Sequence, residues 1–486
     1  MLFNSINFAF FLPIVFIGYW LVRKKYANQN FLLLAASYYF YSCWDWRFLF
    51  LLIFSTSLDY FSGIIMSTSK VEKHRKIWFW LSVGINLGFL GVFKYYNFFI
   101  DSFSQIVSEI GLKVEIKTLS IILPVGISFY TFHGLSYVID IYKKRINTER
   151  NFIDYSLFVS FFPLLVAGPI ERATHLLPQL KKKKSFDYLK SVDGLRQILW
   201  GLFKKMVIAD NCAEYANLIF NNSADYSGFS LFIGAVFFTF QIYGDFSGYS
   251  DIAIGTAKLF GIDLLKNFSF PYFSRDIAEF WRRWHISLST WFRDYIYIPL
   301  GGSQVNKWRK IRNTFVIFII SGFWHGANWT FVFWGLLNAF YFIPLLLKKR
   351  NRSNLDTVSA GKVFPSLKEI FSISKTFILV IIGWIFFRAN NLGHSFSYIK
   401  EMFIGLFSKQ SYVEALNLIH WKIGYVLPLL IILFYLIEWM GRESNHALER
   451  FGLGWKKGIR ISLYYALVLL IYYFGGNEQE FIYFQF

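Results

Sequence analysis

The sequence predicts an all-α protein that crosses a membrane many times. Of its 486 residues, 55% are hydrophobic, 22% are aromatic and only 16% are charged. A soluble domain cannot bury so much apolar surface, and many apolar runs reach the roughly 20 residues that a spanning helix needs. We therefore expect one integral-membrane domain over residues 1–486, with roughly eleven to thirteen membrane segments.

The charge distribution indicates membrane lipid as a partner and argues against nucleic acid. The formal net charge is +20, but the basic residues lie in short clusters between apolar runs. Cytoplasmic loops beside anionic lipid have this pattern. The two cysteines, Cys43 and Cys212, support neither a disulfide framework nor a metal site.

The basic clusters also set the direction of each span. The first apolar run, 6–22, lacks a cleavage site and is followed by the basic cluster 23–25, so we expect the N-terminus outside. Alternation along the chain leaves the C-terminus outside as well. The further expected spans are 31–43, 47–66, 77–100, 120–142, 194–220, 229–260, 376–387, 424–440 and 459–474.

Two other segments are not expected to span. Residues 155–167 are too short and stop at Gly168 and Pro169, which favours a re-entrant or in-plane helix on the cytoplasmic side. Residues 277–297 mix aromatic and charged side chains, so we expect one amphipathic helix lying at the cytoplasmic interface.

His325 is the strongest candidate for a functional residue. It lies in the run 313–347, which contains no Asp, Glu, Lys or Arg and has basic clusters at both ends. Twelve residues from Asn313 span roughly 18 Å of about 30 Å of hydrocarbon, so His325 should lie near mid-membrane at the turn of a broken hairpin. An ionisable residue there indicates function. The alternative is a core histidine that binds a backbone carbonyl.

His285 is the second candidate. It follows Arg282 and Arg283 in a segment, 280–295, that is rich in aromatic residues. Such a segment suits an anchor at headgroup level, and it also suits a site for a phosphate-bearing ligand, because arginine pairs with phosphate through two hydrogen bonds.

Two carboxylates lie between apolar segments at Asp245 and Asp251. The small residues between them are typical of close helix packing. The carboxylates need partners at that depth, and we expect structural pairing with Arg282 or Arg283, with the orientation of a histidine as the alternative. The spacing of His285 and His325 matches no zinc motif, so we expect no metal.

Two motifs resemble a known family. Residues 281–285 read Trp-Arg-Arg-Trp-His, and residues 323–327, about forty positions later, read Phe-Trp-His-Gly-Ala. This pair resembles the signature of the membrane-bound O-acyltransferases, and within them the bacterial branch of alginate and peptidoglycan O-acetyltransferases. The D-alanine-transferring protein of teichoic acid synthesis belongs to the same branch. Further matching segments are 123–130, 167–170, 243–250 and 299–302.

The resemblance implies a fold and a reaction. A ring of transmembrane helices would surround a central funnel in a bacterial cytoplasmic membrane. An acyl group, acetyl in the expected case, would pass from a cytoplasmic thioester such as acetyl-CoA to an extracytoplasmic polysaccharide through a secreted partner. The thioester would be a substrate, with no cofactor permanently bound.

The resemblance also implies roles for the conspicuous residues. His325 would be the general base, and His285 would act near the donor. Asn328 is a weaker candidate for stabilising the oxyanion. Donor binding would fall to Arg282 and Arg283, together with two tryptophans of the same motif, Trp281 and Trp284.

The C-terminal tail, 475–486, is expected outside the membrane and ends in four aromatic residues out of six. Such a segment is costly to leave in water, so we expect it to bury itself, either as an interfacial anchor or in the funnel. Its F-x-Y-x-x-F pattern resembles that of a small partner peptide in the D-alanine system. This resemblance makes Tyr483 a candidate acyl carrier.

Two other functions fit parts of the sequence. An acyltransferase that modifies a lipid or a lipoprotein would share the same motifs but take its acceptor from the bilayer. A transporter or channel would also use broken helices and an intramembrane histidine, but such proteins usually show internal symmetry, which this sequence lacks.

Overall fold

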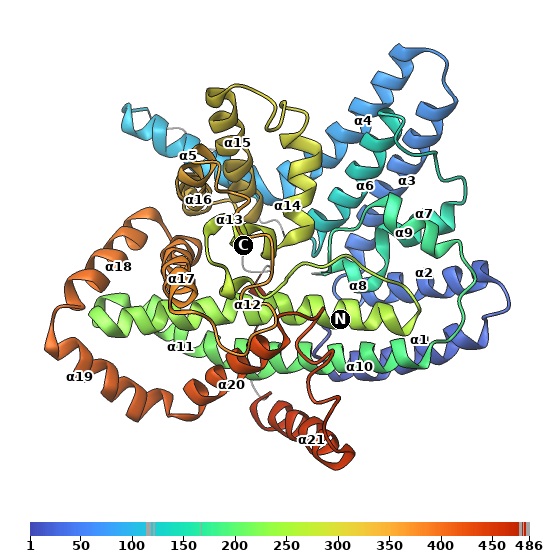
Figure 1. The fold of residues 1–486 in the computed structure, drawn as a ribbon. Helices are drawn as coiled ribbons and strands as arrows, with labels where there is room; N and C mark the ends of the chain where they lie inside the picture. Colours follow the sequence, from blue (N-terminus) through green and yellow to red (C-terminus); the bar gives the residue numbers. More distant parts are fainter. Residues whose placement is uncertain (113–117, 120–121, 167, 476–478, 480, 483–486) are drawn as a thin grey trace. The chain divides into compact units, whose positions relative to one another are not determined.

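The computed structural model describes the whole chain except residues 113–117, 120–121, 167, 476–478, 480 and 483–486. The described residues form helices and loops, without any strand (Figure 1). The prediction of an all-α protein is therefore confirmed.

The chain divides into two compact units. Unit 1 comprises residues 1–194 and 253–265, and unit 2 comprises 195–252 and 266–486. Helices α10 (Tyr188–Leu202) and α12 (Gly228–Leu259) contribute to both units. The candidate site lies entirely within unit 2.

Unit 1 has helices close to the predicted spans 6–22, 31–43 and 47–66, whereas the helical stretch expected at 77–100 covers 72–109 and the one expected at 120–142 begins at Ile127. One further expectation is corrected. The described part of the segment 155–167 is not one in-plane helix but two short buried ones, because Phe161 leaves the helical conformation at ψ 115° and Pro163 lies in the first turn of the second helix. The helices of unit 1 before α10 are α1 (Ile6–Leu21), α2 (Tyr26–Ser42), α3 (Arg47–Thr68), α4 (Glu72–Leu90), η1 (Gly91–Tyr95), α5 (Tyr96–Glu109), α6 (Ile127–Tyr142), α7 (Phe152–Ser160), α8 (Phe162–Leu165) and α9 (Ala173–Leu180).

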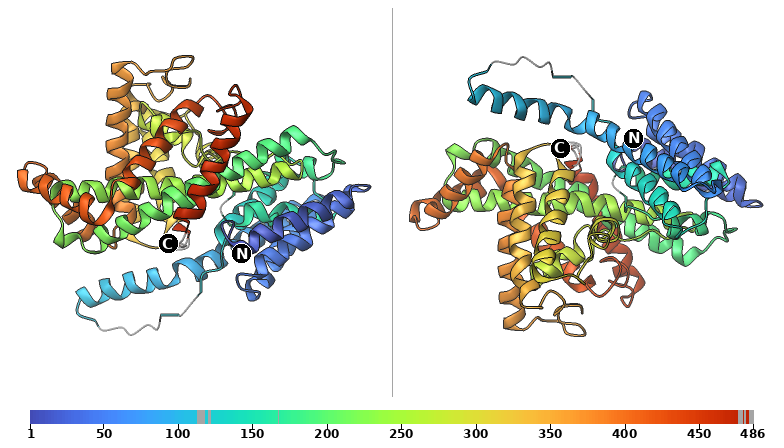
Figure 2. Two further views of the ribbon diagram at one scale, coloured as in Figure 1. Left: turned by 90° about the horizontal axis from the view of Figure 1, so that it is seen from below. Right: turned by 90° about the horizontal axis from the view of Figure 1, so that it is seen from above.

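Unit 2 begins with two long helical segments that lie side by side (Figures 1 and 2). One is the end of α10 followed by η2 (Phe203–Ala209) and α11 (Asp210–Asn221), and the other is α12. The rest comprises η3 (Ser223–Asp225), η4 (Pro271–Phe273), α13 (Ile277–Arg283), α14 (Ile286–Phe292), η5 (Arg293–Tyr297), α15 (Lys307–His325), α16 (Trp329–Leu347), α17 (Leu367–Arg388), α18 (Leu392–Gly405), α19 (Lys409–Leu418), η6 (Ile419–Ile423), α20 (Val426–Gly441) and α21 (Lys457–Phe474).

Several described helices are long and apolar enough to cross a membrane. Six stretches meet this condition, and a seventh does if the bent pair Lys409–Ile423 and Val426–Gly441 is one span. The protein is thus a multi-pass membrane protein, whereas the larger span count expected from the sequence stays a prediction. The six stretches are Arg47–Thr68, Glu72–Glu109, Gly228–Leu259, Trp329–Leu347, Leu367–Arg388 and Lys457–Phe474.

The predicted hairpin around His325 is confirmed. Helix α15 ends at His325 and α16 begins at Trp329. The two helices touch through glycines, since a Cβ at Gly322 would lie 2.2 Å from the Phe331 carbonyl oxygen. A Cβ at Gly335 would lie equally close to the Phe318 carbonyl oxygen. The glycines let the backbones of α15 and α16 pack closely together. The close packing fixes the position of the turn that joins them, directly after His325.

We predict that Gly322→Ala separates α15 from α16 and destabilises the protein by about 1–3 kcal/mol, as overpacked cores do. Gly84→Ala in α4 is a matched control, because a Cβ there meets no atom within 4 Å. The control should be neutral or stabilising by up to about 1 kcal/mol, since alanine favours helix. Thermal unfolding in detergent measures both, and a Gly322→Ala melting point at or above wild type would contradict the prediction.

Candidate active site

His325 is the last residue of α15, and its side chain packs against aromatic rings. Its side chain is only 3% exposed. The imidazole stands perpendicular to the Trp334 ring of α16, with centroids 5.2 Å apart, and 5.3 Å from the Phe387 ring of α17. Rings from α16 and α17 therefore hold the His325 imidazole in one position.

His285 joins two short helices where one long helix was expected. The predicted amphipathic helix over 277–297 is wrong, because the chain breaks between α13 and α14. His285 has φ 42° and ψ 55°, the left-handed conformation that non-glycine residues rarely adopt. It is 1% exposed, so the break lies in the interior. Strained conformations of this kind persist only where the surroundings over-determine them.

Asn267 supplies that constraint. Its backbone carbonyl accepts the Ile286 N–H at 2.8 Å, and its side-chain oxygen accepts the Ser287 hydroxyl at 2.5 Å. Its amide nitrogen donates to the Ser250 hydroxyl of α12 at 2.9 Å. Asn267 thus ties the residues that follow His285 to α12. The sequence offered no signal for this role, because these partners are distant in the chain.

The two candidate histidines meet in the structure. Their ring centroids are 6.5 Å apart, although about forty residues separate them. Within the described part of the chain, neither ring nitrogen of His285 has a hydrogen-bond partner. A buried imidazole without a partner is costly, so its nitrogens are available to a ligand at this place.

Asp245 and Asp251 form ion pairs as predicted, but with lysines and not with the predicted arginines. Lys205 is 2.8 Å from Asp245, and Lys204 is 2.6 Å from Asp251. Both lysines lie in η2 and are almost fully buried. The signal was present in the sequence as two charged residues in the middle of the apolar segment 194–220, where charges need partners.

The arginines of the His285 motif instead hold a loop. Arg282 donates to the carbonyl oxygens of Asn351 and Asn354 at 2.6 and 2.7 Å. Arg283 donates to Glu279 and to the Asp356 carbonyl oxygen at 3.0 Å. These bonds attach the loop between α16 and α17 to α13.

The same loop carries an ion pair at its surface. Arg275 is 2.9 Å from the Asp356 carboxylate, and this hydrogen-bonded guanidinium holds the pKa of Asp356 below its usual range. The side chain of Asp356 is largely exposed, so the pair contributes little to stability.

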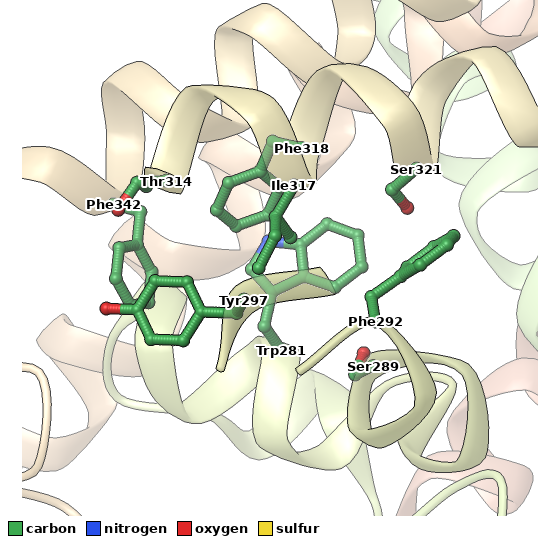
Figure 3. A pocket seen from close by; sticks show the side chains of 9 residues that line it. All are labelled: Trp281, Ser289, Phe292, Tyr297, Thr314, Ile317, Phe318, Ser321 and Phe342. Carbon is green, nitrogen blue, oxygen red and sulfur yellow. The ribbon is translucent and has the colours of Figure 1, made fainter. Parts of the chain in front are cut away.

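A cavity of about 160 Å³ lies against the His285 and His325 helices. Ser289, Phe292 and Ser321 lie at one end, and Tyr297, Thr314 and Phe342 lie at the other, with Trp281 between them (Figure 3). Ser289 and Ser321 are each one helical turn from a histidine. Trp284, in contrast, is buried among other rings, including Trp384 at 4.9 Å, and does not line the cavity.

Asn328 has a structural role in this conformation. Its side-chain oxygen accepts the Thr330 N–H at 3.0 Å and caps α16, and its amide nitrogen donates to the Asn390 carbonyl oxygen at 2.9 Å. Helix capping is a sufficient structural reason for an asparagine at this position. A role for Asn328 in stabilising the oxyanion stays a prediction.

The burial predicted for the aromatic end of the chain is confirmed at two of its residues. Phe481 and Ile482 are 0% and 1% exposed. The Ile482 N–H donates to Asp245 at 2.7 Å. Tyr483, the candidate acyl carrier, lies outside the described residues.

Comparison with known proteins decides the family. The model of the MBOAT family, the membrane-bound O-acyltransferases, matches residues 143–387, which include both histidines and α12. The chain belongs to the membrane-bound O-acyltransferase family. The resemblance that the two motifs indicate is therefore confirmed.

Relatives in the family carry three different names. The probable alginate O-acetylase AlgI of Pseudomonas aeruginosa is 39% identical over 90% of this chain and 81% of its own length. The peptidoglycan O-acetyltransferase of Helicobacter pylori is 34% identical over 100% of this chain and 98% of its own. The teichoic acid D-alanyltransferase of Streptococcus thermophilus is 30% identical over 60% of this chain and 75% of its own.

Proposed function

We propose that the protein moves an acyl group, acetyl in the expected case, from a cytoplasmic thioester to an acceptor that O-acylates an extracytoplasmic polysaccharide. The names of the alginate and peptidoglycan relatives support the polysaccharide. The observation that carries the proposal is the meeting of two buried imidazoles, 6.5 Å apart, with a cavity whose lining includes Ser289 and Ser321, one helical turn from each. A secreted partner would complete transfer to the polymer.

His325 is the general base in this reaction. A hydroxyl is a weak nucleophile, so the imidazole takes its proton as the hydroxyl oxygen bonds to the thioester carbon. The tetrahedral adduct then collapses, the carbon–sulfur bond breaks, and the imidazolium returns its proton to the leaving thiolate. The products are an ester and a thiol. The nitrogens of His285 would hold the donor at its reacting end.

The cavity suits the thin arm of a thioester such as acetyl-CoA. Its Ser289 and Ser321 end would hold the thioester, and its Thr314 end leads toward the basic first turns of α15, which contain Lys307, Arg309 and Lys310. Arg282 and Arg283 remain candidates for the donor phosphates, although each would have to exchange a carbonyl partner for phosphate. Trp281 lines the arm's path, whereas Trp284 is buried among other rings and would not touch the donor.

Tyr483 would be the first acyl acceptor. A phenol has a pKa near 10, so His325 removes its proton more readily than that of a sugar hydroxyl. The resulting aryl ester is a good acyl donor to a second enzyme. The burial of Phe481 and Ile482 near Asp245 supports a tail that belongs to the site.

We predict that His325→Ala reduces acyl transfer at least tenfold without unfolding the protein, because a positioned general base accounts for about 10²–10⁴ in rate. His420→Ala, on the exposed turn η6, is the matched control and should retain full activity. Release of radiolabelled acetyl from acetyl-CoA by purified protein, with thermal melts alongside, measures the effect. More than about a tenth of wild-type activity in His325→Ala would refute the general-base role.

The donor site predicts a second result. Ser321→Leu fills the cavity and should weaken the binding of coenzyme A about 5- to 160-fold, since overpacking costs about 1–3 kcal/mol. Thr314→Val keeps the volume of another lining residue and should bind nearly normally. Calorimetric titration compares the two variants, and unchanged affinity in Ser321→Leu would exclude this cavity as the donor site.

The carrier role predicts that Tyr483→Phe abolishes polymer acylation in cells, because the ring remains while the nucleophile is lost. Tyr473→Phe removes a hydroxyl from an exposed ring on α21 and serves as the control. Mass spectrometry of the C-terminal peptide should show acyl-tyrosine in wild type. Normal acylation by Tyr483→Phe, together with no acyl-tyrosine, would exclude the carrier role.

A further inference from the structure

Two adjacent lysines lie buried in the middle of the α10–η2–α11 segment. Lys204 and Lys205 are 3% and 1% exposed. The segment forms a π-helical turn at these residues, a feature that is frequent at functional sites. Buried charges in an apolar protein must be paired, and the two lysines are paired differently.

Lys204 forms an ion pair with a carboxylate, whereas Lys205 also contacts the C-terminal segment of the chain. Lys204 pairs with Asp251 at 2.6 Å. Lys205 is 2.8 Å from both Asp210 and Asp245, and it donates to the Gln479 carbonyl oxygen at 3.1 Å. An ammonium group has three N–H donors, so the tail carbonyl takes the last of the three.

The tail also contacts a carboxylate partner of Lys205. Asp210 and Asp245 both pair with the Lys205 ammonium group. The Ile482 N–H donates to the second oxygen of Asp245 at 2.7 Å. A buried carboxylate oxygen without a donor is costly, so the tail's main chain stabilises the cluster, and the cluster in turn holds the tail.

The Phe246 ring lies between Phe481 of the tail and His285. The buried Phe481 ring packs against Tyr249 at 4.4 Å and Phe246 at 6.2 Å, both on α12. Phe246 lies edge-on to the His285 imidazole at 4.7 Å. Asp245, Phe246 and Tyr249 therefore form a continuous contact from the ion-pair cluster to the candidate site.

Close helix packing makes the contact possible. A Cβ at Gly248 would lie 2.8 Å from the Gly201 carbonyl oxygen and 3.1 Å from the Lys205 backbone nitrogen. The glycine brings α12 against η2, which allows the Lys205 ammonium to reach Asp245. A larger residue at this position would separate the two halves of the docking site.

We infer that Lys205 and Asp245 are positioning residues that hold the C-terminal segment, through its main chain at Gln479 and Ile482, beside His285. The effect on catalysis rests on the proposed function, whereas the docking itself does not. Gln479, Phe481 and Ile482 are accordingly a fixed part of the enzyme, and acyl transfer depends on two buried charges that touch neither donor nor acceptor.

The neighbouring pair Lys204–Asp251 provides a matched control on the same two segments. Asp245→Asn should increase hydrogen–deuterium exchange of the C-terminal peptide at least about tenfold, because a charged hydrogen bond to the tail is lost. Acyl transfer should fall with it. Asp251→Asn breaks the other buried pair, which lies on the same two segments, and should leave the exchange of the C-terminal peptide close to wild type.

Ile482→Pro tests the same bond from the tail and leaves the buried cluster intact. Proline has no N–H, so exchange in the C-terminal peptide should rise and transfer should fall, whereas Ile482→Val keeps the N–H and should match wild type. Unchanged tail exchange in both Asp245→Asn and Ile482→Pro, equal tail exchange in Asp245→Asn and Asp251→Asn, or full transfer by an undocked tail would overturn the inference. Failure of the proposed function is distinguishable, because wild type would then transfer no acetyl while the exchange measurements would be unaffected.

Discussion

The pairing of buried charges between η2 and α12 constrains the rest of unit 2. Lys204 and Lys205 are adjacent, and they reach Asp251 and Asp245 on a helix that passes close beside them. A shift of α12 by one residue would turn its side chains by about 100° and leave these charges unpaired. The register of α12 is therefore set, and with it the positions of Phe246 and of the Ser250 hydroxyl that binds Asn267.

The candidate site combines two segments that are held by different means. His285 occupies a strained backbone position that Asn267 and α12 maintain. His325 is placed by a hairpin whose helices touch at glycines and by rings from α16 and α17. Each imidazole is held by its own contacts, so the distance between the two rings is fixed before a substrate binds. Acyl transfer requires preorganisation of this kind.

Much of the architecture follows from local pattern. Apolar runs and basic clusters predict helices such as Arg47–Thr68 and Gly228–Leu259 within a few residues, and the uncharged run around His325 predicts the hairpin. The aromatic tail predicts its own burial, confirmed at Phe481 and Ile482. These predictions succeed because hydrophobicity and helix length are properties of the segment itself.

The rest depends on contacts between distant segments. The break at His285 was missed, because it is stabilised by Asn267 and not by a local helix breaker. Asp245 and Asp251 were given the wrong partners, because the two arginines fold onto a loop that follows α16. Sequence pattern indicates that a buried charge needs a partner, but helix packing decides which one it finds.

A cryo-electron microscopy structure of the purified protein with a non-hydrolysable acetyl-CoA analogue tests the central claim most directly. The claim is that the two histidines and the adjoining cavity form the acyl-transfer site. We expect the analogue's arm to run along Tyr297, Trp281 and Ser321, with its acyl carbon within about 6 Å of a His325 ring nitrogen, the span of one acceptor oxygen between them. An acyl carbon bound more than about 10 Å from His325, or an arm bound outside this cavity, would contradict the account.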